Sequence, residues 1–555
     1  MKPVLERLIQ KAVHEYGKRK GLELPAPFDF DLTVTRDATH GDLATNVAFK
    51  LAKEVRERPN LVADQIVLLL QQETEKDKKA AILNRIEVAG GGFINFYLAK
   101  ASLAAVLTEV YEKDSRYGES DFGRGRKVLL EFVSANPTGP LTIAHGRQAA
   151  VGDALSRILK KTGHDVTTEY YLNDAGRQMN FLGDSVWARY AELVKFEAAF
   201  PEEGYRGEYI RELAAKLLSV KQDSLLHEAP EKRREICREF AKEEMMNLIR
   251  EDLENMRVSF NHYFSESVLY EKKTVDGTLN FLTDQGHLYE KEGALWFRST
   301  DFGDDKDRVV KKSSGEYTYL APDIAYHRYK FERGFNWVIN LWGPDHHGYI
   351  PRLKAACQAL GHAPDQIDIR IVQLTTLYRK GVPVRMSTRA GEFVTLKELM
   401  DEVGVDATRF FFIMRKMESP LDFDLELAKE KSQENPVYYL QYAYARIASL
   451  LKFANQTISP KVNCERLSSN EETDLIKMIT EFPKILTQAS ELLEPYRLTD
   501  YMRDLATTFH KFYSFHRIVT EDQELTEARL LLAEATRIVL RNGLELLGIS
   551  QPESM

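Results

Sequence analysis

The chain has little cysteine: Cys237, Cys357 and Cys464 lie more than a hundred residues apart in a chain of 555. This spacing excludes a disulfide framework and the paired ligands of a structural zinc site. No apolar run approaches the ~18 residues that span a membrane, and the N-terminus lacks the apolar core of a signal peptide. We therefore expect a cytoplasmic protein without a membrane segment or a protein-bound structural metal.

An excess of basic residues is also missing. The 76 Lys and Arg are outnumbered by 84 Asp and Glu, giving a net charge of −8, so total charge alone does not indicate a nucleic-acid partner. The 43% hydrophobic and 29% charged residues are typical of soluble globular proteins. Since the length exceeds what one core supports, we expect about three or four domains of ~150 residues.

Hydrophobic periodicity divides the chain into three parts. Residues 1–115 mix helical patterns at 5–16 and 43–56 with a strand at 93–97, as in a small α/β domain. A charged, glycine-containing stretch at 113–126 then marks a boundary. After residue 430 only helical patterns remain, at 438–453, 475–493, 501–515 and 527–547. They predict an all-α helical bundle over 431–555.

The central part, 116–430, begins with a βαβ pattern. A strand at 128–133, a Pro/Gly turn, a helix at 145–161 and a strand at 166–172 follow one another within ~45 residues, which is typical of a right-handed crossover in a Rossmann-like, doubly wound parallel sheet. Strand patterns return at 337–342 and 369–372. We expect a helical insertion at about 185–300 to split this sheet, with the binding crevice at the carboxyl ends of the strands.

The turn after the first strand leads into a candidate phosphate site. His145 enters the N-terminus of a helix, where free N–H groups and the dipole favour anions. Gly146 allows close approach of the backbone, and His145 and Arg147 can donate to a phosphate. A helix-capping loop with a satisfied histidine is the alternative. Farther along, the loop 378–391 carries four cations and two glycines and could clamp a triphosphate, or could be a solvated basic loop.

These segments carry a family resemblance. Thr-Ile-Ala-His at 142–145 stands where class I aminoacyl-tRNA synthetases have His-Ile-Gly-His, and Arg-Met-Ser-Thr-Arg at 385–389 stands where they have Lys-Met-Ser-Lys-Ser. Further segments also resemble those of one family and follow one another in the same order as in that family; they lie at 40–46, 134–140, 173–178, 343–349 and 542–548. Together they resemble the bacterial type of arginyl-tRNA synthetase over nearly the whole chain.

The resemblance implies that the protein activates L-arginine with ATP and transfers the arginyl group to tRNA(Arg), with Mg²⁺ bound to ATP as the metal involved. It implies that activation requires bound tRNA, and that the protein is a monomer. The implied catalytic residues are Thr142, His145, Arg385, Ser387 and Arg389. The implied ATP contacts are Ala144, His145, Gly146, Gly343, Asp345, His347 and Met386.

The arginine site can also be argued from chemistry, because a guanidinium in a partly desolvated pocket needs carboxylates and planar acceptors. Glu131 and Asn136 flank the end of the first strand, and Tyr319 and Asp323 lie four residues apart farther on. The resemblance places the arginine contacts on these four positions. Glu131 could instead pair with a structural cation, and Asp323 could be a helix N-cap.

The resemblance implies tRNA contacts in both outer domains, at Asn46, Phe93, Tyr442 and Arg446. Residues 433–555 carry 13 basic and 17 acidic side chains, so any attraction for RNA there is local. The aromatic residues of 438–446 could stack on unpaired bases, or could belong to the core of the bundle.

Two features leave alternatives open. Thr142 and Thr388 replace a signature histidine and lysine, so either Lys380, Arg385 and Arg389 supply the missing charge or activation is slow or lost. One alternative function is therefore an RNA-binding paralogue without catalytic activity. Another is a different class I synthetase, such as the cysteinyl type, or a related nucleotidyl transferase. The cysteinyl type lacks support because the sequence has no suitable cysteine pairs to bind its zinc ion. Asp345, His346 and His347 could suggest a metal site, but adjacent histidines at a strand end point in opposite directions, and we favour the nucleotide role.

Overall fold

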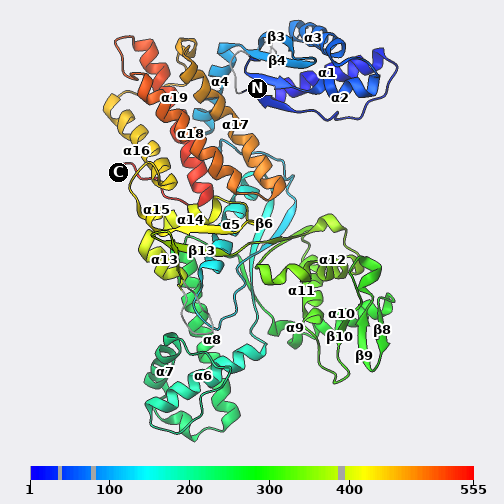
Figure 1. The fold of residues 1–555 in the computed structure, drawn as a ribbon, viewed down its shortest axis with the longest axis vertical. Coiled ribbons are helices and arrows are strands. Elements are labelled where there is room, and N and C mark those ends of the chain that lie inside the picture. Colours follow the sequence, from blue (N-terminus) through cyan, green and yellow to red (C-terminus); the bar gives the residue numbers. More distant parts are fainter. Residues whose placement is uncertain (1, 36–39, 77–82, 385–393) are drawn as a thin grey trace.

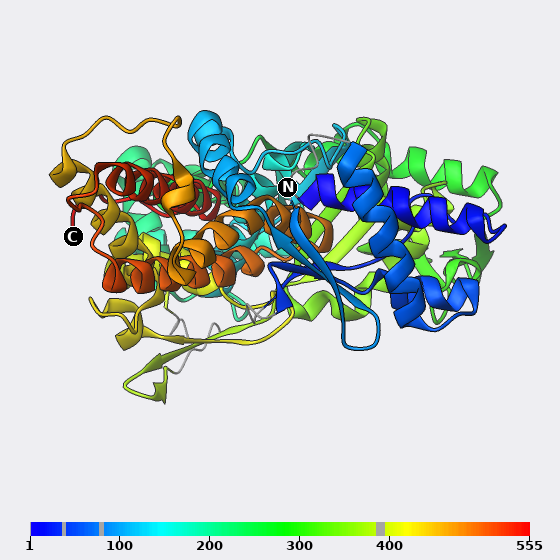
Figure 2. The ribbon, with the colours of Figure 1, turned by 90° about the horizontal axis from the view of Figure 1, so that it is seen from above.

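The computed structural model describes residues 2–35, 40–76, 83–384 and 394–555. The N-terminal domain and the C-terminal bundle lie side by side at one end of the molecule, and two lobes of the central part extend from the other end (Figure 1). From above, the bundle (orange to red) and the N-terminal domain (blue) occupy opposite sides (Figure 2). No helix in the described ranges has the length and hydrophobicity needed to cross a bilayer.

The N-terminal part is the expected small α/β domain. Its antiparallel sheet has the order β1-β2-β4-β3, and three helices complete its core. The strands are β1 Leu32–Val34, β2 Leu43–Thr45, β3 Leu83–Ala89 and β4 Phe93–Leu98, and the helices are α1 Lys2–Arg19, α2 Val47–Val55 and α3 Pro59–Lys76. The helix predicted from residue 43 begins only at Val47, because residues 43–45 pair with β4 instead.

A five-stranded parallel sheet forms the centre of the molecule, in the order β12-β11-β5-β6-β7. This confirms the predicted Rossmann-like sheet. The strands are β5 Lys127–Glu131, β6 Asp165–Leu172, β7 His262–Ser265, β11 Trp337–Trp342 and β12 Ile367–Ile371. The central strands β5 and β11 are buried over almost their whole length, as continuous apolar runs require. Helix α5, Ile143–Lys161, makes the crossover between β5 and β6.

The chain leaves this sheet twice between β6 and β11, once on each side of β7. The first excursion is a helical lobe with its own apolar core, formed by α6 Arg177–Leu193, α7 Glu208–Lys221 and α8 Pro230–Asn255. The second contains α9 Ser267–Glu271, α10 Thr274–Asp284, the antiparallel strands β8 Leu288–Lys291, β9 Ala294–Phe297 and β10 Arg308–Lys311, and α11 Leu320–Glu332.

The expected helical insertion at about 185–300 therefore also contains strands. It includes β7, which pairs in parallel with β6 and belongs to the main sheet, and the β8–β9 hairpin. Each of these strands is four residues long, too short for alternation to stand out in a charged sequence. The domain limits near 115 and 430 remain our proposal.

The C-terminal part is the predicted helical bundle. Its helices are α16 Pro436–Ala454, α17 Asn470–Leu492, α18 Tyr496–Phe515 and α19 Gln523–Leu547. Side-chain caps fix three of the starts: Asn435, Ser469 and Asp522 each accept a backbone N–H of the first turn. Helix α4, Lys100–Lys113, leads from the N-terminal domain onto this bundle, where the Tyr111 hydroxyl donates to the Ile458 carbonyl at 3.1 Å.

A small layer joins the sheet to the bundle. It consists of β13 Thr375–Arg379, β14 Val382–Pro383 and β15 Leu421–Asp424 with α13 Leu396–Val403, α14 Val405–Ile413 and α15 Leu425–Lys429. Helix α12, Ile350–Ala359, instead makes the crossover between β11 and β12 and shares the apolar core of α11. Arg409 of α14 is fully buried and donates to the carbonyl oxygens of Met256 and Leu547, both at 2.8 Å. This arginine therefore joins the central domain to the end of α19.

Candidate functional site

Acidic side chains gather where the parallel strands end. Glu131 is the last residue of β5, Glu266 follows β7, and Asp323 lies in the first turn of α11. Burial raises the pKa of Asp323 to about 7, with further contributions from the charges of Glu266 and Glu131. A buried carboxyl group whose pKa is raised by two neighbouring carboxylates forms a site that a cation would stabilise.

Two of these carboxyl groups are oriented by tyrosines. The Tyr349 hydroxyl donates to Asp323 Oδ2 at 2.7 Å. Glu266 accepts from the Tyr171 hydroxyl at 2.8 Å and from the Tyr270 hydroxyl at 3.1 Å, and burial raises its pKa as well. Neutral donors therefore fix the positions of both carboxyl groups, and no cation of the described residues pairs with Asp323 or Glu266.

Glu131, in contrast, already has a cationic partner. Its Oε2 accepts a hydrogen bond from Lys330 Nζ, and Lys330 also donates to Asn340 Oδ1 at 2.9 Å. The other carboxylate oxygen accepts from Ser134 Oγ at 3.0 Å. The structure therefore shows the pairing with a structural cation that the sequence left open for Glu131.

The turn after β5 is conformationally unusual. Val133 and Ser134 both have positive φ, 67° and 40°, which costs free energy for residues with a Cβ. In this conformation Ser134 Oγ also accepts the Tyr171 backbone N–H at 3.0 Å. The strained turn thus connects Glu131 to the neighbouring strand β6.

The other two predicted arginine contacts lie differently. Asn136 Nδ2 donates to Gln178 Oε1 at 2.6 Å, at the start of α6. Tyr319 directly precedes α11 and its side chain is 79% exposed. It therefore lies near Asp323 along the chain but is not packed against the acidic side chains.

The start of α5 places His145 close to the sheet edge. The Thr142 backbone N–H donates to His145 Nδ1 at 3.2 Å, which puts the ring proton on Nε2. Burial lowers the pKa of His145 to about 4, so the imidazole is neutral at pH 7. His145 can therefore offer one N–H, at Nε2, to an anion next to the helix start.

Two neighbours of His145 have structural roles. A Cβ on Gly146 would lie 2.5 Å from Leu396 Cδ1, so the missing side chain permits packing against α13. Arg147 is fully buried, and its Nη1 donates to the carbonyl oxygens of Gln373 and Ser419 at 2.8 and 2.9 Å. The expectation that Arg147 donates to a phosphate is wrong, because its guanidinium serves buried carbonyl groups. Ala144, the other predicted ATP contact here, lies in the first turn of α5 and is half-buried.

The remaining predicted ATP contacts follow β11. Gly343 precedes a 3₁₀ helix, η6 Pro344–Tyr349, that contains Asp345 and His347, both exposed. A Cβ on Gly343 would lie 3.7 Å from Gln148 Nε2 of α5, so the end of β11 reaches the start of α5. Within the described ranges, no three His, Cys, Asp or Glu side chains gather as a metal site.

Arg385, Met386, Ser387 and Arg389 lie outside the described residues. The segment that follows them is placed, however. Thr395 forms an antiparallel bridge with Thr142, and the Leu396 N–H donates to the Leu141 carbonyl at 2.8 Å. The chain after the second signature is therefore hydrogen-bonded to the first.

The predicted tRNA contacts of the N-terminal domain lie on its surface. Asn46 Nδ2 donates to Asp31 Oδ2 at 2.5 Å, and Asn46 Oδ1 accepts the Asp31 backbone N–H at 2.9 Å. Phe93 is 46% exposed and meets Phe49 edge-on, with ring centroids 4.8 Å apart. One of these residues orders a turn, and the other leaves an aromatic face accessible.

The predicted contacts in the bundle belong to an aromatic ladder between α16 and α18. Tyr442 stacks on Tyr438 with ring centroids 6.3 Å apart, and Arg446 lies over the rings of Tyr442 and Tyr513 at 5.2 and 4.2 Å. Because Tyr442 and Arg446 are only half-buried, the ladder combines packing with an accessible edge.

Sequence reasoning missed Glu266, Tyr349 and Lys330. Glu266 follows the short strand β7, which no pattern indicated. Tyr349 closes the segment 343–349, whose resemblance to the family could have drawn attention to it. Lys330 lies at a position of α11 that becomes buried, and a lone lysine in a helical pattern gives no sign of this.

Comparisons with known proteins match each of the three parts of the chain. Three family models match in order: "Arginyl tRNA synthetase N terminal domain" at 3–98, "tRNA synthetases class I (R), catalytic domain" at 106–420 and "DALR anticodon binding domain" at 440–555. The arginine–tRNA ligase 1 of Halalkalibacterium halodurans is 46% identical over 100% of this chain and 99% of its own.

Two further similarities cover nearly all of the chain. The arginine–tRNA ligase of Desulfosudis oleivorans is 47% identical, covering 100% of both chains. The solved arginyl-tRNA synthetase of Thermus thermophilus shares the fold, with a TM-score of 0.78 and 22% identity over 99% of this chain and 100% of that one. With a catalytic-domain model that matches more than half of its length, the chain belongs to the arginyl-tRNA synthetase family.

Proposed function

We infer that this chain is an arginine–tRNA ligase, which joins L-arginine to the 3′ end of tRNA(Arg) at the expense of ATP. The observation that supports this most directly is the group of desolvated carboxyl groups at the sheet edge, Glu131, Glu266 and Asp323. A guanidinium is the side-chain cation whose planar set of donors suits several fixed oxygens at once.

In our proposal, the guanidinium of arginine binds Asp323 and Glu266, while Glu131 remains held by Lys330. Tyr349 and the tyrosines around Glu266 fix the oxygens that accept. Asn136 and Tyr319 border the entrance and complete the contacts to the amino acid. Since no cation of the described residues pairs with Asp323, the charge attraction contributes to affinity.

ATP is proposed to lie between the start of α5 and η6, with its phosphates at the helix N-terminus. His145 donates from Nε2 to a phosphate oxygen, and Gly343, Asp345 and His347 border the ribose and base. Ala144, Gly146 and Met386 belong to the same proposed binding region, and Thr142, Arg385, Ser387 and Arg389 to the catalytic set. Mg²⁺ enters bound to the phosphates of its substrate.

Two displacements follow. A carboxylate oxygen of arginine attacks the α-phosphorus, the bond to the bridging oxygen breaks, and pyrophosphate leaves with that electron pair. A terminal ribose hydroxyl of tRNA then attacks the arginyl carbonyl, loses its proton, and AMP leaves. The protein contributes position and charge stabilisation to both steps.

The outer domains are proposed to bind tRNA, through Asn46 and Phe93 on one side and Tyr442 and Arg446 on the other. Because tRNA charging supplies ribosomes, we propose that the protein works in the cytoplasm, as a monomer. Whether arginine activation needs bound tRNA is part of the same proposal.

The test is exchange of pyrophosphate into ATP, measured with and without arginine and tRNA(Arg), followed by arginylation of a tRNA(Arg) transcript. We expect exchange to require arginine and to rise with tRNA. Tight tRNA binding without exchange or arginylation would favour an RNA-binding protein without catalysis. Activity with cysteine in place of arginine would favour another class I synthetase.

The cationic loop after β13 allows a separate prediction. We expect Arg385→Ala to slow pyrophosphate exchange about 10–100-fold, because one cation proposed to act on the transferring phosphates is lost. Affinity for arginine, measured by calorimetry, should stay within about twofold. Lys397→Ala is the matched control: Lys397 is an exposed lysine of α13 that pairs with Asp401, and its loss should leave the exchange rate unchanged. An unchanged exchange rate in the Arg385 variant would refute compensation for Thr142 and Thr388.

Asp323 predicts a pH dependence. Its pKa of about 7 means that the free protein carries a neutral carboxyl group there at lower pH, and a neutral carboxyl group cannot pair with the guanidinium. We expect kcat/KM for arginine to decrease below about pH 7, with a slope that approaches a tenfold decrease per pH unit. Glu266 and Glu131 favour the protonated form and Lys330 opposes it. His145, neutral at these pH values, should not contribute. A flat profile between pH 5.5 and 8 would contradict the assignment.

A further inference from the structure

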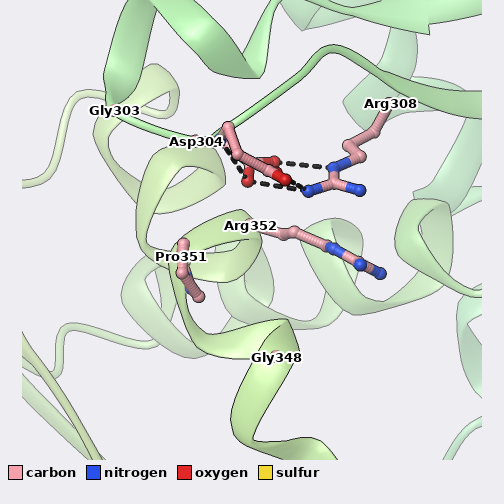
Figure 3. A pocket seen from close by; sticks show the side chains of 7 residues that line it. Gly303, Asp304, Arg308, Gly348, Pro351 and Arg352 are labelled. Atoms are coloured by element: carbon pink, nitrogen blue, oxygen red, sulfur yellow. Dashed lines mark hydrogen bonds and ion pairs between the residues drawn. The ribbon is translucent and has the colours of Figure 1, made fainter.

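A pocket lies between the β9–β10 connection and the start of α12. Its volume is about 490 Å³, which suits one nucleotide unit. Seven residues line it: Gly303, Asp304, Asp305, Arg308, Gly348, Pro351 and Arg352 (Figure 3). The first of these residues, Gly303, directly follows the 3₁₀ turn η5, Ser299–Phe302. Gly348 lies in η6, and Pro351 and Arg352 lie in the first turn of α12.

The acids of this pocket are already bound to one arginine. Arg308 Nε donates to Asp304 Oδ2 at 2.8 Å and its Nη2 to Asp304 Oδ1 at 2.9 Å. The same Nη2 also donates to Asp305. Arg308 Nη1 has no hydrogen-bond partner among the described residues, so its two N–H bonds remain for a ligand.

Arg352 has no carboxylate partner in the described part of the chain. Its Nε is buried without a hydrogen-bond partner, and its guanidinium carbon lies 5.5 Å from the centre of the Tyr349 ring. In Figure 3 its side chain extends beneath the Arg308 guanidinium, towards the same side of the pocket. Its two Nη groups make no hydrogen bond to another described residue, so they remain for an anionic ligand. Such a ligand would offset the cost of holding this cation in a partly desolvated place.

The pocket is connected to the acidic site by a single residue. Tyr349 supports the Arg352 guanidinium with its ring and donates its hydroxyl to Asp323. A ligand in contact with Arg352 is therefore one side chain away from the proposed arginine site. In the proposed function, the 3′ end of tRNA accepts the arginyl group, so the end of the tRNA chain must pass near this pocket.

We propose that this pocket binds a phosphodiester of the single-stranded 3′ end of tRNA, with Arg352 as the main cation and Arg308 Nη1 as a second donor. This rests on the proposed function. The two aspartates and two arginines cancel in charge, so the pocket suits the single charge of a diester better than the higher charge of pyrophosphate. A guanidinium fork matches two oxygens of one phosphate.

The experiment compares Arg352→Ala with Arg298→Ala. Arg298, on the same insertion, likewise lies over a tyrosine ring, 4.6 Å from that of Tyr289, but does not line the pocket. Binding of a tRNA(Arg) transcript, intact or lacking its last three nucleotides, is followed by fluorescence anisotropy over a range of salt. We expect Arg352→Ala to bind intact tRNA about tenfold more weakly, with a salt slope smaller by about 0.7. The shortened tRNA should bind both proteins equally, Arg298→Ala should behave as the unchanged chain, and Arg352→Lys should recover part of the loss.

Three results would overturn the proposal: unchanged binding of intact tRNA by Arg352→Ala, an equal loss with the shortened tRNA, or a raised KM for ATP with unchanged tRNA binding, which would assign the pocket to ATP. These binding measurements do not depend on turnover. Absence of arginylation by the unchanged chain would count against the proposed function, whereas normal arginylation with an unaffected Arg352 variant would count against this pocket alone.

Discussion

Replacing Asp323 by asparagine is expected to raise the KM for arginine about 100-fold, equivalent to about 2.7 kcal/mol of lost binding free energy. The asparagine keeps the shape and can still accept from Tyr349, but it lacks the charge that the guanidinium requires. The substitution leaves Glu266 as a carboxylate that can still pair with the guanidinium, so binding is weakened and not abolished. Initial rates of pyrophosphate exchange at varied arginine concentration measure the effect.

The control for Asp323→Asn is Tyr349→Phe, which removes the hydroxyl donated to Asp323 Oδ2 but keeps the carboxylate. We expect this variant to raise the KM for arginine by less than about tenfold, because one neutral hydrogen bond is lost. The KM for ATP should stay nearly constant in both variants. Equal effects of both substitutions would mean that Asp323 acts by holding Tyr349 and does not contact arginine.

The overall architecture could be predicted because it depends on long patterns. Four of the five parallel strands and four long amphipathic helices leave signals over many residues. The exception is β7, whose four residues are recruited by pairing with β6. Short strands of this kind are defined by their neighbours, so tertiary context decides them and the local sequence does not.

The site was predicted in part, for a related reason. Glu131 and Asp323 lie at the ends of elements, where a carboxylate has a recognisable function, and the structure brings them together. The partners Lys330 and Glu266 depend on which side of α11 faces β5 and on where β7 ends. The buried orientation of Arg147 has the same origin: the carbonyl groups that it binds belong to residues more than two hundred positions away, and no local motif contains them.

Lys330 gives the largest predicted effect on stability. Its side chain is fully buried and donates both to Glu131 and to Asn340. Lys330→Met leaves the Glu131 carboxylate in the interior without its cation, which is expected to lower the free energy of unfolding of the central domain by about 3–5 kcal/mol. Urea unfolding, followed through the fluorescence of Trp337 and Trp342 on the adjacent strand β11, measures this change.

The double variant Glu131→Gln with Lys330→Met removes both charges and should recover most of the loss, because burying an unpaired charge, and not the absence of the ion pair, causes the instability. Lys312→Met is the matched control: Lys312 pairs with Glu316 at an exposed position, and its loss should cost less than about 0.5 kcal/mol. Arginine should stabilise Lys330→Met more than the unchanged chain, since its guanidinium can serve the carboxylate that Lys330 left. If the free energy of unfolding of Lys330→Met lies within about 1 kcal/mol of that of the unchanged chain, Glu131 does not depend on Lys330 for its charge. In that case it is wrong to divide the acidic site into one carboxylate paired with Lys330 and two carboxyl groups that bind the substrate.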